Sequence, residues 1–203
     1  MTAVQALARL RSLGVPLVES ADAAAVLGQE ASATARTLAR LAQAGLVDRV
    51  RHGTWWMDPP ADPYRLAAHL TLPFDAYLSL QSALHHHGLI EQIPAVHYVV
   101  SLARTQRIQT CVGVYSVHHL APEVFGGFLE SAGGARIATP EKALFDVAWL
   151  SGGRSRLFAG LPELTLPSGF DHQELARWLG RVHSQRDRTR VERKVAGFVA
   201  GAQ

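Results

Sequence analysis

The sequence predicts an α+β protein in two parts: a helical N-terminal domain with one hairpin, then a mixed α/β domain with a helical C-terminus. Three of the five residues 59–63 are proline, and no regular element is expected to cross them because proline lacks a backbone donor and fixes φ. Before this break the patterns are short helices and two short strands, and after it strand-like runs alternate with capped helices. We therefore expect domains over residues 1–58 and 63–203.

Composition is that of a globular chain. Of its 203 residues, 48% are hydrophobic and 18% are charged. No apolar run approaches the ~20 residues of a membrane helix, and residues 1–10 lack the basic start and continuous apolar core of a signal peptide. The single cysteine, Cys111, excludes an internal disulfide and suits a reducing compartment. We expect a cytoplasmic protein with no membrane contact, in which Cys111 is a buried small hydrophobic residue.

The basic residues are almost all arginine. Only Lys142 and Lys194 are lysines among twenty basic residues, and the net charge is +3. Arginine suits phosphate and guanine, but the abundance of alanine, glycine and valine also indicates a GC-rich genome. Composition alone therefore does not establish nucleic-acid binding.

Apolar spacing, caps and glycines predict three helices in the N-terminal domain, over residues 4–13, 21–27 and 33–44. Ser20 and Ser32 stand where the N-caps of the second and third helices are expected. On the third helix, Arg36, Thr37 and Arg40 are spaced to share one face. Two helices joined by a tight turn, the second with an arginine-bearing outer face, are typical of a helix-turn-helix.

A basic hairpin follows the third helix. Residues 46–50 and 54–57 predict two strands around a tip of Arg51, His52 and Gly53, which is the pattern of a wing that reaches phosphate or a minor groove. Trp55 and Trp56 alternate on the second strand, so we expect one of them to face inward. The prediction is a winged helix-turn-helix.

Candidate DNA contacts come from both elements. They are Ser32, Thr34, Arg36, Thr37 and Arg40 from the third helix, with Arg49, Arg51 and His52 from the hairpin. The alternatives are that the arginines only form a solvated helix face, or that the winged domain contacts proteins instead of DNA.

The second domain mixes helices and strands. Helices are predicted over residues 63–70, 75–87, 140 onward, 175–183 and 188–199, and strands over 96–102, 106–110, 112–118 and 135–138. Thr139 is the expected N-cap of the helix that begins at Pro140, with Glu141 in its first turn.

Several segments of this domain resemble the AbiEi-family antitoxins, the regulatory partners in bacterial nucleotidyltransferase toxin–antitoxin pairs. The segments are SLQSALHHHGLI (79–90), the strand with Arg107, VYSVHHL (114–120) and, most specifically, IATPEKALFDVAWL (137–150). The resemblance covers about residues 5–150. The residues that carry it are His87, Gly88, Arg107, His118, Thr139, Pro140, Glu141, Lys142, Phe145 and Asp146.

The resemblance implies an antitoxin that represses its own operon by binding upstream double-stranded DNA, at repeated or inverted sites, and that counteracts a cognate nucleotidyltransferase toxin. Separately from the resemblance, we expect no enzymatic activity and no cofactor, because the residues show no catalytic constellation. Two alternatives remain open. The chain could be a stand-alone repressor whose second domain dimerises or senses a signal, or a nucleic-acid-processing enzyme targeted by the winged domain.

The residues themselves predict neither a metal site nor a catalytic site. The side chains of the consecutive histidines 85–87 fan about 100° apart on a helix and cannot converge on one ion. His118 and His119 alternate across a strand, and Glu141, Lys142 and Asp146 fit a capped helix start better than a nuclease site.

The segment at about 171–200 is strongly basic. It holds seven basic residues between 177 and 194 against Asp187 and Glu192, which leaves +5. The open interpretations are a nucleic-acid surface, a docking surface for an acidic partner, or a solvated face of two helices.

Overall fold

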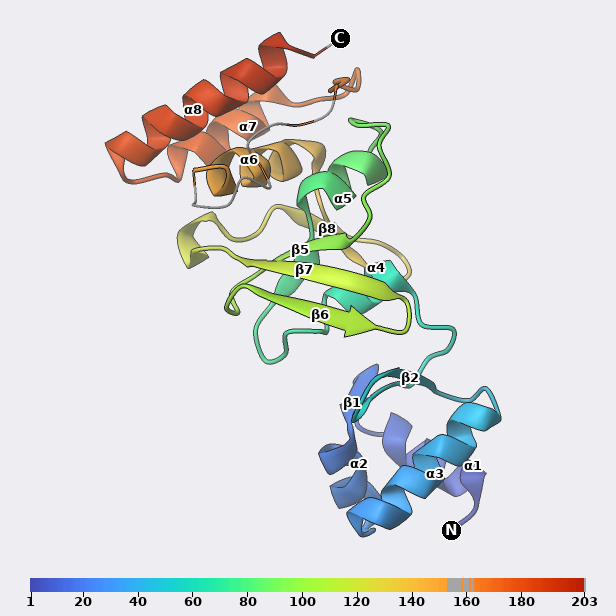
Figure 1. Cartoon of the computed structure of the whole chain (residues 1–203). Coiled ribbons are helices and arrows are strands. Elements are labelled where there is room, and N and C mark those ends of the chain that lie inside the picture. Colours follow the sequence, from blue (N-terminus) through green and yellow to red (C-terminus); the bar gives the residue numbers. More distant parts are fainter. Residues whose placement is uncertain (153–157, 159–160, 162, 203) are drawn as a thin grey trace.

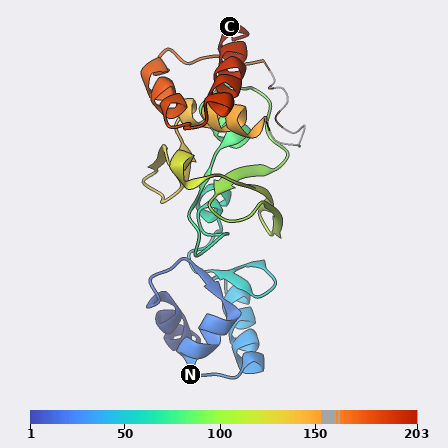
Figure 2. The same ribbon diagram turned by 90° about the vertical axis from the view of Figure 1, so that its left-hand side faces the viewer.

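The computed structural model describes residues 1–152, 158, 161 and 163–202. The protein is a mixed α+β protein, as the sequence predicts. Its N-terminal unit, residues 1–58, lies at one end of the molecule. A six-stranded sheet lies in the middle, and helices α6, α7 and α8 stack at the opposite end (Figures 1 and 2).

The N-terminal unit packs three helices against a small antiparallel sheet. Its elements are α1 (Ala3–Arg11), β1 (Leu17–Glu19), α2 (Ser20–Leu27), α3 (Ala31–Gln43), β2 (Asp48–Arg51) and β3 (Thr54–Trp56). The strands are ordered β1-β3-β2, with β3 in the centre. Leu10, Leu38 and Leu41 are fully buried in its core, where they anchor α1 and α3.

Local chemistry explains where these helices begin and end. Thr2 and Gln5 form a reciprocal capping box at the start of α1, and Gly28 ends α2 in the left-handed conformation that glycine adopts without steric cost. The predicted serine caps are wrong. Ser20 is already the first residue of α2, and α3 begins before Ser32, with glutamates at both N-cap positions and no side-chain cap bond.

The second unit is built on a mixed sheet with the strand order β6-β7-β5-β4-β9-β8. Its strands are β4 (Ala76–Leu78), β5 (His97–Ser101), β6 (Gln106–Thr110), β7 (Gly113–His119), β8 (Phe128–Glu130) and β9 (Arg136–Ala138). Its helices are α4 (Pro63–Ala67), α5 (Leu80–His86), the 3-10 turn η1 (Pro122–Val124), α6 (Pro140–Leu150), α7 (His172–Gly180) and α8 (Gln185–Ala200). The β4–β9 and β5–β7 pairs are parallel, and the other pairs are antiparallel.

The helix predicted over residues 75–87 is wrong in its first half. Residues Ala76–Leu78 form β4, which pairs with β5 on one side and with β9 on the other. All three side chains are buried, and a short apolar run that is buried on both faces has no period by which a strand can be told from a helix. The helix begins only at Leu80, whose φ of 55° marks the sharp turn out of the sheet.

The two units share a continuous packed junction. Trp55 is buried in the small core of the N-terminal unit, whereas Trp56 is buried in the large core of the second unit. The sequence predicts that one of the two faces inward; in the structure both do, because β3 has a hydrophobic core on each side. Val50 of β2 also packs into the large core, and its carbonyl oxygen accepts a hydrogen bond of 2.8 Å from the backbone N–H of Cys111.

Cys111 itself departs from its predicted environment. It lies in the turn between β6 and β7 and is exposed, because the strand ends at Thr110 and the next begins at Gly113. Among the described residues, no helix is long and apolar enough to cross a bilayer.

Candidate nucleic-acid interface

Helix α3 presents one exposed stripe along its whole length. The exposed residues recur three and four positions apart, as one face of a helix requires. They are Ala31, Ser32, Ala35, Arg36, Ala39, Arg40 and Gln43. The two arginines alternate with alanines, so the stripe carries positive charge between small side chains. This places Ser32, Arg36 and Arg40 of the predicted contacts on one surface.

Thr34 and Thr37 are not on this surface. They are buried, with exposed fractions of 1% and 5%, and form the inner face of α3 with Leu38 and Leu41. Their prediction as DNA contacts is therefore corrected: the apolar face of the helix is wide enough to include both threonines. The Thr37 hydroxyl donates to the Ala33 carbonyl oxygen and to Gln29 Oε1, each at 3.1 Å, which attaches the α2–α3 turn to the helix.

The arginines of the N-terminal unit fall into two groups. The guanidinium of Arg11 donates to the Met57 carbonyl oxygen, while Arg49 and Arg51 have partners within the hairpin region. By contrast, Arg9, Arg36 and Arg40 make no side-chain hydrogen bond or ion pair with any described residue, so their donors are available to a ligand.

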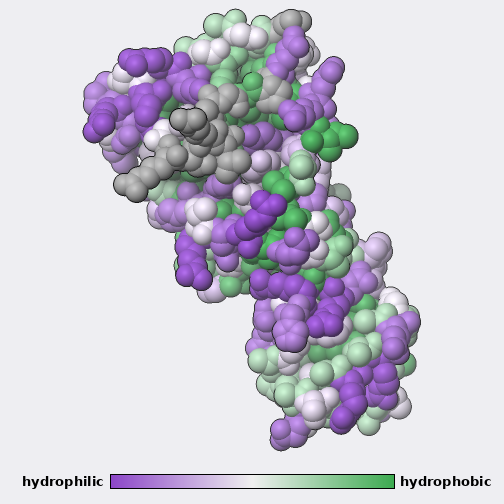
Figure 3. Space-filling model, in the orientation of Figure 1, coloured by the Kyte–Doolittle hydropathy of each residue, from purple (hydrophilic) through white to green (hydrophobic). Residues whose placement is uncertain are grey.

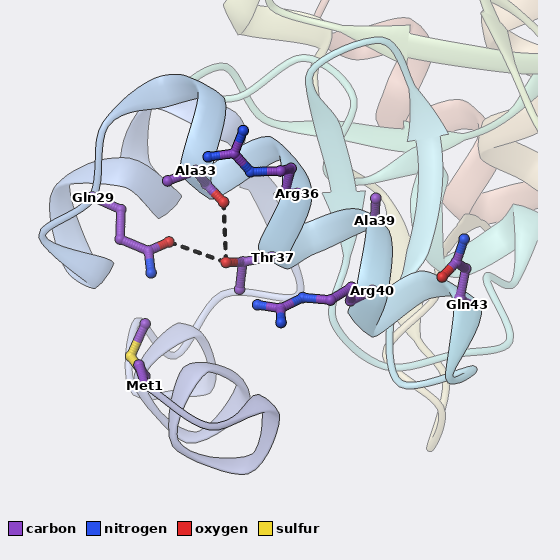
Figure 4. A pocket seen from close by; sticks show the side chains of 8 residues that line it. All are labelled: Met1, Gln29, Ala33, Arg36, Thr37, Ala39, Arg40 and Gln43. Atoms are coloured by element: carbon purple, nitrogen blue, oxygen red, sulfur yellow. Dashed lines mark hydrogen bonds between the residues drawn. The ribbon is translucent and has the colours of Figure 1, made fainter.

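A hollow of about 560 Å³ opens beside the exposed stripe. Its lining consists of Met1, Gln29, Ala33, Arg36, Thr37, Ala39, Arg40 and Gln43. None of these eight residues is acidic. Figure 4 shows the Arg36 and Arg40 side chains extending from α3 toward the same side of the view, where Gln29 and Met1 lie. The hollow is thus bordered by cations and amides on several elements.

The predicted wing residues are exposed, but their side chains are engaged locally. Arg49 lies 5.8 Å from the centre of the Trp55 ring, and its Nη2 is 3.1 Å from Nδ1 of His52. Arg51 donates to the Thr54 hydroxyl, and its Nη2 is 3.7 Å from Oε1 of Glu19. Both arginines are exposed, and a surface ion pair such as Arg51–Glu19 is worth only about 0–1 kcal/mol, so these side chains can exchange their local contacts for phosphate.

The most specific segment of the second unit forms a buried polar network. Thr139 caps α6 by accepting from the Lys142 backbone N–H, and Lys142 Nζ pairs with Asp146 one turn later. The other Asp146 oxygen accepts hydrogen bonds from the Tyr77 hydroxyl (3.2 Å) and the Ser79 hydroxyl (2.7 Å). Burial lowers the pKa of Lys142 and raises the pKa of Asp146, and the opposite charge of each partner counteracts the shift.

This network joins α6 to its neighbours. The Glu141 carboxylate is buried and accepts from the backbone N–H of Asp171, and the Thr139 hydroxyl donates to Glu174, so both fix α7 against α6. Pro140 occupies the first turn, and Phe145 is fully buried against the rings of α6 and α7. These residues therefore hold the unit together, and Glu141, Lys142, Phe145 and Asp146 are buried while Thr139 and Pro140 are partly exposed.

The remaining residues of the resemblance are scattered. His87 Nε2 lies 2.7 Å from the Ala138 carbonyl oxygen, and Gly88 ends α5 with a φ of 74°. His118 is buried beside aromatic rings, and that burial lowers its pKa below 6.5. Arg107 is exposed on the edge strand β6. Nowhere among the described residues do three His, Cys, Asp or Glu side chains form a group that could hold a metal ion.

The basic C-terminal segment forms the exposed faces of α7 and α8. Figure 3 shows hydrophilic side chains gathered over these helices at the upper left. Arg177 pairs with a carboxylate of its own unit, and Arg188 and Arg190 donate to backbone carbonyl oxygens. Arg186 and Arg193 are exposed. Much of the predicted +5 charge is therefore engaged within the unit.

Sequence reasoning missed the residues that complete the hollow. Gln29 belongs to the turn and Gln43 ends the exposed stripe of α3, while Met1 comes from the start of the chain. The i, i+3, i+4 spacing would have added Gln43 to the stripe. Nothing in the local sequence places Met1 there, because its position depends on how α1 packs against α3.

A scan against models of known protein families and a search of curated proteins found no match to this chain. The resemblance to AbiEi-family antitoxins therefore stays a prediction from the sequence motifs.

Proposed function

We propose that this protein is a DNA-binding transcriptional regulator whose N-terminal unit acts as a winged helix-turn-helix. In this proposal α2 and α3 are the helix-turn-helix, α3 is the recognition helix, and the β2–β3 hairpin is the wing. The observation that carries the proposal is the exposed stripe of α3, where Arg36 and Arg40 have no partner among the described residues and border a hollow without an acidic side chain.

The chemistry of the stripe suits the major groove. A guanidinium can donate two parallel hydrogen bonds to O6 and N7 of guanine, and Arg36 and Arg40 are one helical turn apart. Ala35 and Ala39 lie on the same face, and their small side chains allow the helix backbone to approach base edges and thymine methyl groups. Each arginine that reads a base is expected to contribute about 1–3 kcal/mol of discrimination.

We further propose that the regulator is an antitoxin that represses its own operon and opposes a nucleotidyltransferase toxin in the cytoplasm. Support comes from the motifs of residues 79–150, whose helix α6 forms part of the core of the second unit. The second unit would then be the part that opposes the toxin.

The first test is a binding titration of the protein against the DNA upstream of its own gene and against unrelated DNA, at several salt concentrations. The variants are Arg36→Ala/Arg40→Ala and, as a matched control, Arg104→Ala, which removes an exposed arginine of the second unit. We expect site-selective binding that the double variant loses and the control keeps. Binding that is weak, steeply salt-dependent and blind to sequence in all three proteins would refute base recognition by α3.

The second test addresses the toxin. The protein is co-expressed with the nucleotidyltransferase encoded beside its gene, and growth is measured. Rescue by both the full chain and the DNA-binding-deficient double variant would assign neutralisation to the second unit. No rescue by a well-folded full chain, together with site-selective DNA binding, would favour a stand-alone repressor.

A further inference from the structure

A second hollow, of about 480 Å³, continues the candidate interface from α3 onto α1. It shares Met1 and Gln29 with the hollow beside the recognition stripe. Its other lining residues are Gln5, Arg9, Leu27 and Gly28, and again none is acidic. Gln5 and Arg9 are four residues apart on α1, so their side chains lie on one face of that helix.

Arg9 has the same electrostatic character as the two arginines of the stripe. It is exposed and makes no hydrogen bond or ion pair through its side chain with the described part of the chain. Of the six arginines in residues 1–58, the three that are unpaired in this way are Arg9, Arg36 and Arg40, and each lines one of the two neighbouring hollows. The arginines with partners inside the protein line neither.

The position of Arg9 on α1 determines which part of DNA it can reach. The major groove is about 12 Å wide and admits a single α-helix, whose own diameter with side chains is about 10–12 Å. Since α1 packs against α3, it cannot enter the groove beside it. A cation on α1 therefore meets the sugar-phosphate wall of the groove and not the base edges.

We propose that Arg9, with the amide side chains of Gln5 and Gln29, forms a subsite for a backbone phosphate of double-stranded DNA. This proposal rests on the proposed DNA-binding function. In it, Arg9 fixes the position of α3 along the duplex, and Arg36 and Arg40 read sequence. Gln29 links the two tasks because it lines both hollows and is held by the Thr37 hydroxyl at 3.1 Å.

Phosphate contacts and base contacts leave different signatures. Losing one phosphate contact weakens binding to every DNA sequence by the same factor and reduces the slope of log K against log salt concentration by about 0.9. Losing a base contact instead lowers the preference for one sequence over another.

The experiment compares the wild-type protein with Arg9→Gln, Arg40→Ala and the control Arg104→Gln. Each is titrated against the upstream DNA and a scrambled duplex at four or more salt concentrations. Thermal melting checks that the exposed substitutions leave folding unchanged. We expect Arg9→Gln to lose affinity equally for both duplexes and to lower the salt slope by about 0.9, with the sequence preference kept. Arg104→Gln should change neither quantity.

The outcomes separate this inference from the function on which it rests. If wild type and Arg40→Ala behave as proposed but Arg9→Gln keeps the wild-type affinity and slope, the phosphate subsite is wrong and the regulator proposal stands. A changed sequence preference with an unchanged slope would also overturn the subsite, because Arg9 would then read bases. If the wild-type protein shows no site-selective binding, both proposals fail.

Discussion

The buried pair of Lys142 and Asp146 makes the second unit vulnerable to a single substitution, Lys142→Met. Both side chains have no exposed surface. The Lys142 ammonium also lies 4.7 Å from the centre of the Trp178 ring and 5.0 Å from that of Phe145. Methionine has nearly the same length and keeps the apolar contacts of the lysine stem, so the substitution removes mainly the positive charge.

The magnitude follows from what the substitution leaves behind. Removing one member of a buried ion pair costs about 3–5 kcal/mol, because the other charge stays buried without compensation. Asp146 keeps its hydrogen bonds from the hydroxyls of Tyr77 and Ser79, which places the expected loss near the lower end, at about 3 kcal/mol. Domains of this kind have total stabilities of about 5–15 kcal/mol, so the variant still folds but is much weakened.

Urea unfolding followed by circular dichroism measures this loss. With a slope of about 2 kcal/mol per molar urea, the midpoint should fall by about 1.5 M. The double variant Lys142→Met/Asp146→Asn removes both charges and keeps an amide oxygen for the two hydroxyls, so it should be more stable than Lys142→Met alone. A loss below about 1 kcal/mol for Lys142→Met, or simple additivity in the double variant, would refute the reasoning.

Three further predictions concern stability. Burial lowers the pKa of His118 in the folded protein below the value of about 6.5 that it has in the unfolded chain. Between the two pKa values the unfolded chain binds more protons, so stability should fall as the pH drops below about 6.5. His118→Phe should reduce this pH dependence in urea melts. Trp56→Ala should lower the free energy of unfolding by about 3–5 kcal/mol and loosen the junction between the units. Amide hydrogen exchange at β2 should then become faster. Exchange that increases only around α1 would contradict the assignment of Trp56 to the large core. Gly127→Ala should destabilise more than Gly134→Ala in thermal melts. Both glycines have positive φ, but a Cβ at Gly127 would overlap the Trp178 indole, while at Gly134 it meets nothing within 4 Å.

The sequence predicts this fold well where a local signal is strong. Periodicity and glycine stops located α1, α2 and α3, and the strands β5, β6, β7 and β9 came within one or two residues of their bounds. The sequence does not predict β4, because its own residues are equally compatible with a helix. It is a strand because β5 and β9 pair with it on either side. Tertiary context decides such short apolar runs.

In the candidate interface, too, the sequence predicts what depends on the helix alone and misses what depends on packing. Spacing of three and four residues correctly brought Arg36 and Arg40 to one exposed face, because that geometry belongs to the helix alone. The sequence also makes Thr37 part of that face and Thr34 a candidate DNA contact, but both threonines are buried. A threonine carries both a methyl and a hydroxyl group, so its residue type does not state which side of a helix it occupies, and the packing of α3 decided it.

The resemblance to antitoxins must be interpreted in light of where its residues lie. Glu141, Lys142, Phe145 and Asp146 are all buried, and Lys142 and Asp146 bond to one another. A side chain without exposed surface cannot contact a toxin or an operator, so what these residues specify is the packing of α6 against its neighbours. In the proposed antitoxin function, the surface that opposes the toxin would therefore consist of other residues. Exposed substitutions that abolish toxin rescue without changing the urea midpoint will locate it, whereas Lys142→Met should impair rescue only to the extent that it lowers stability.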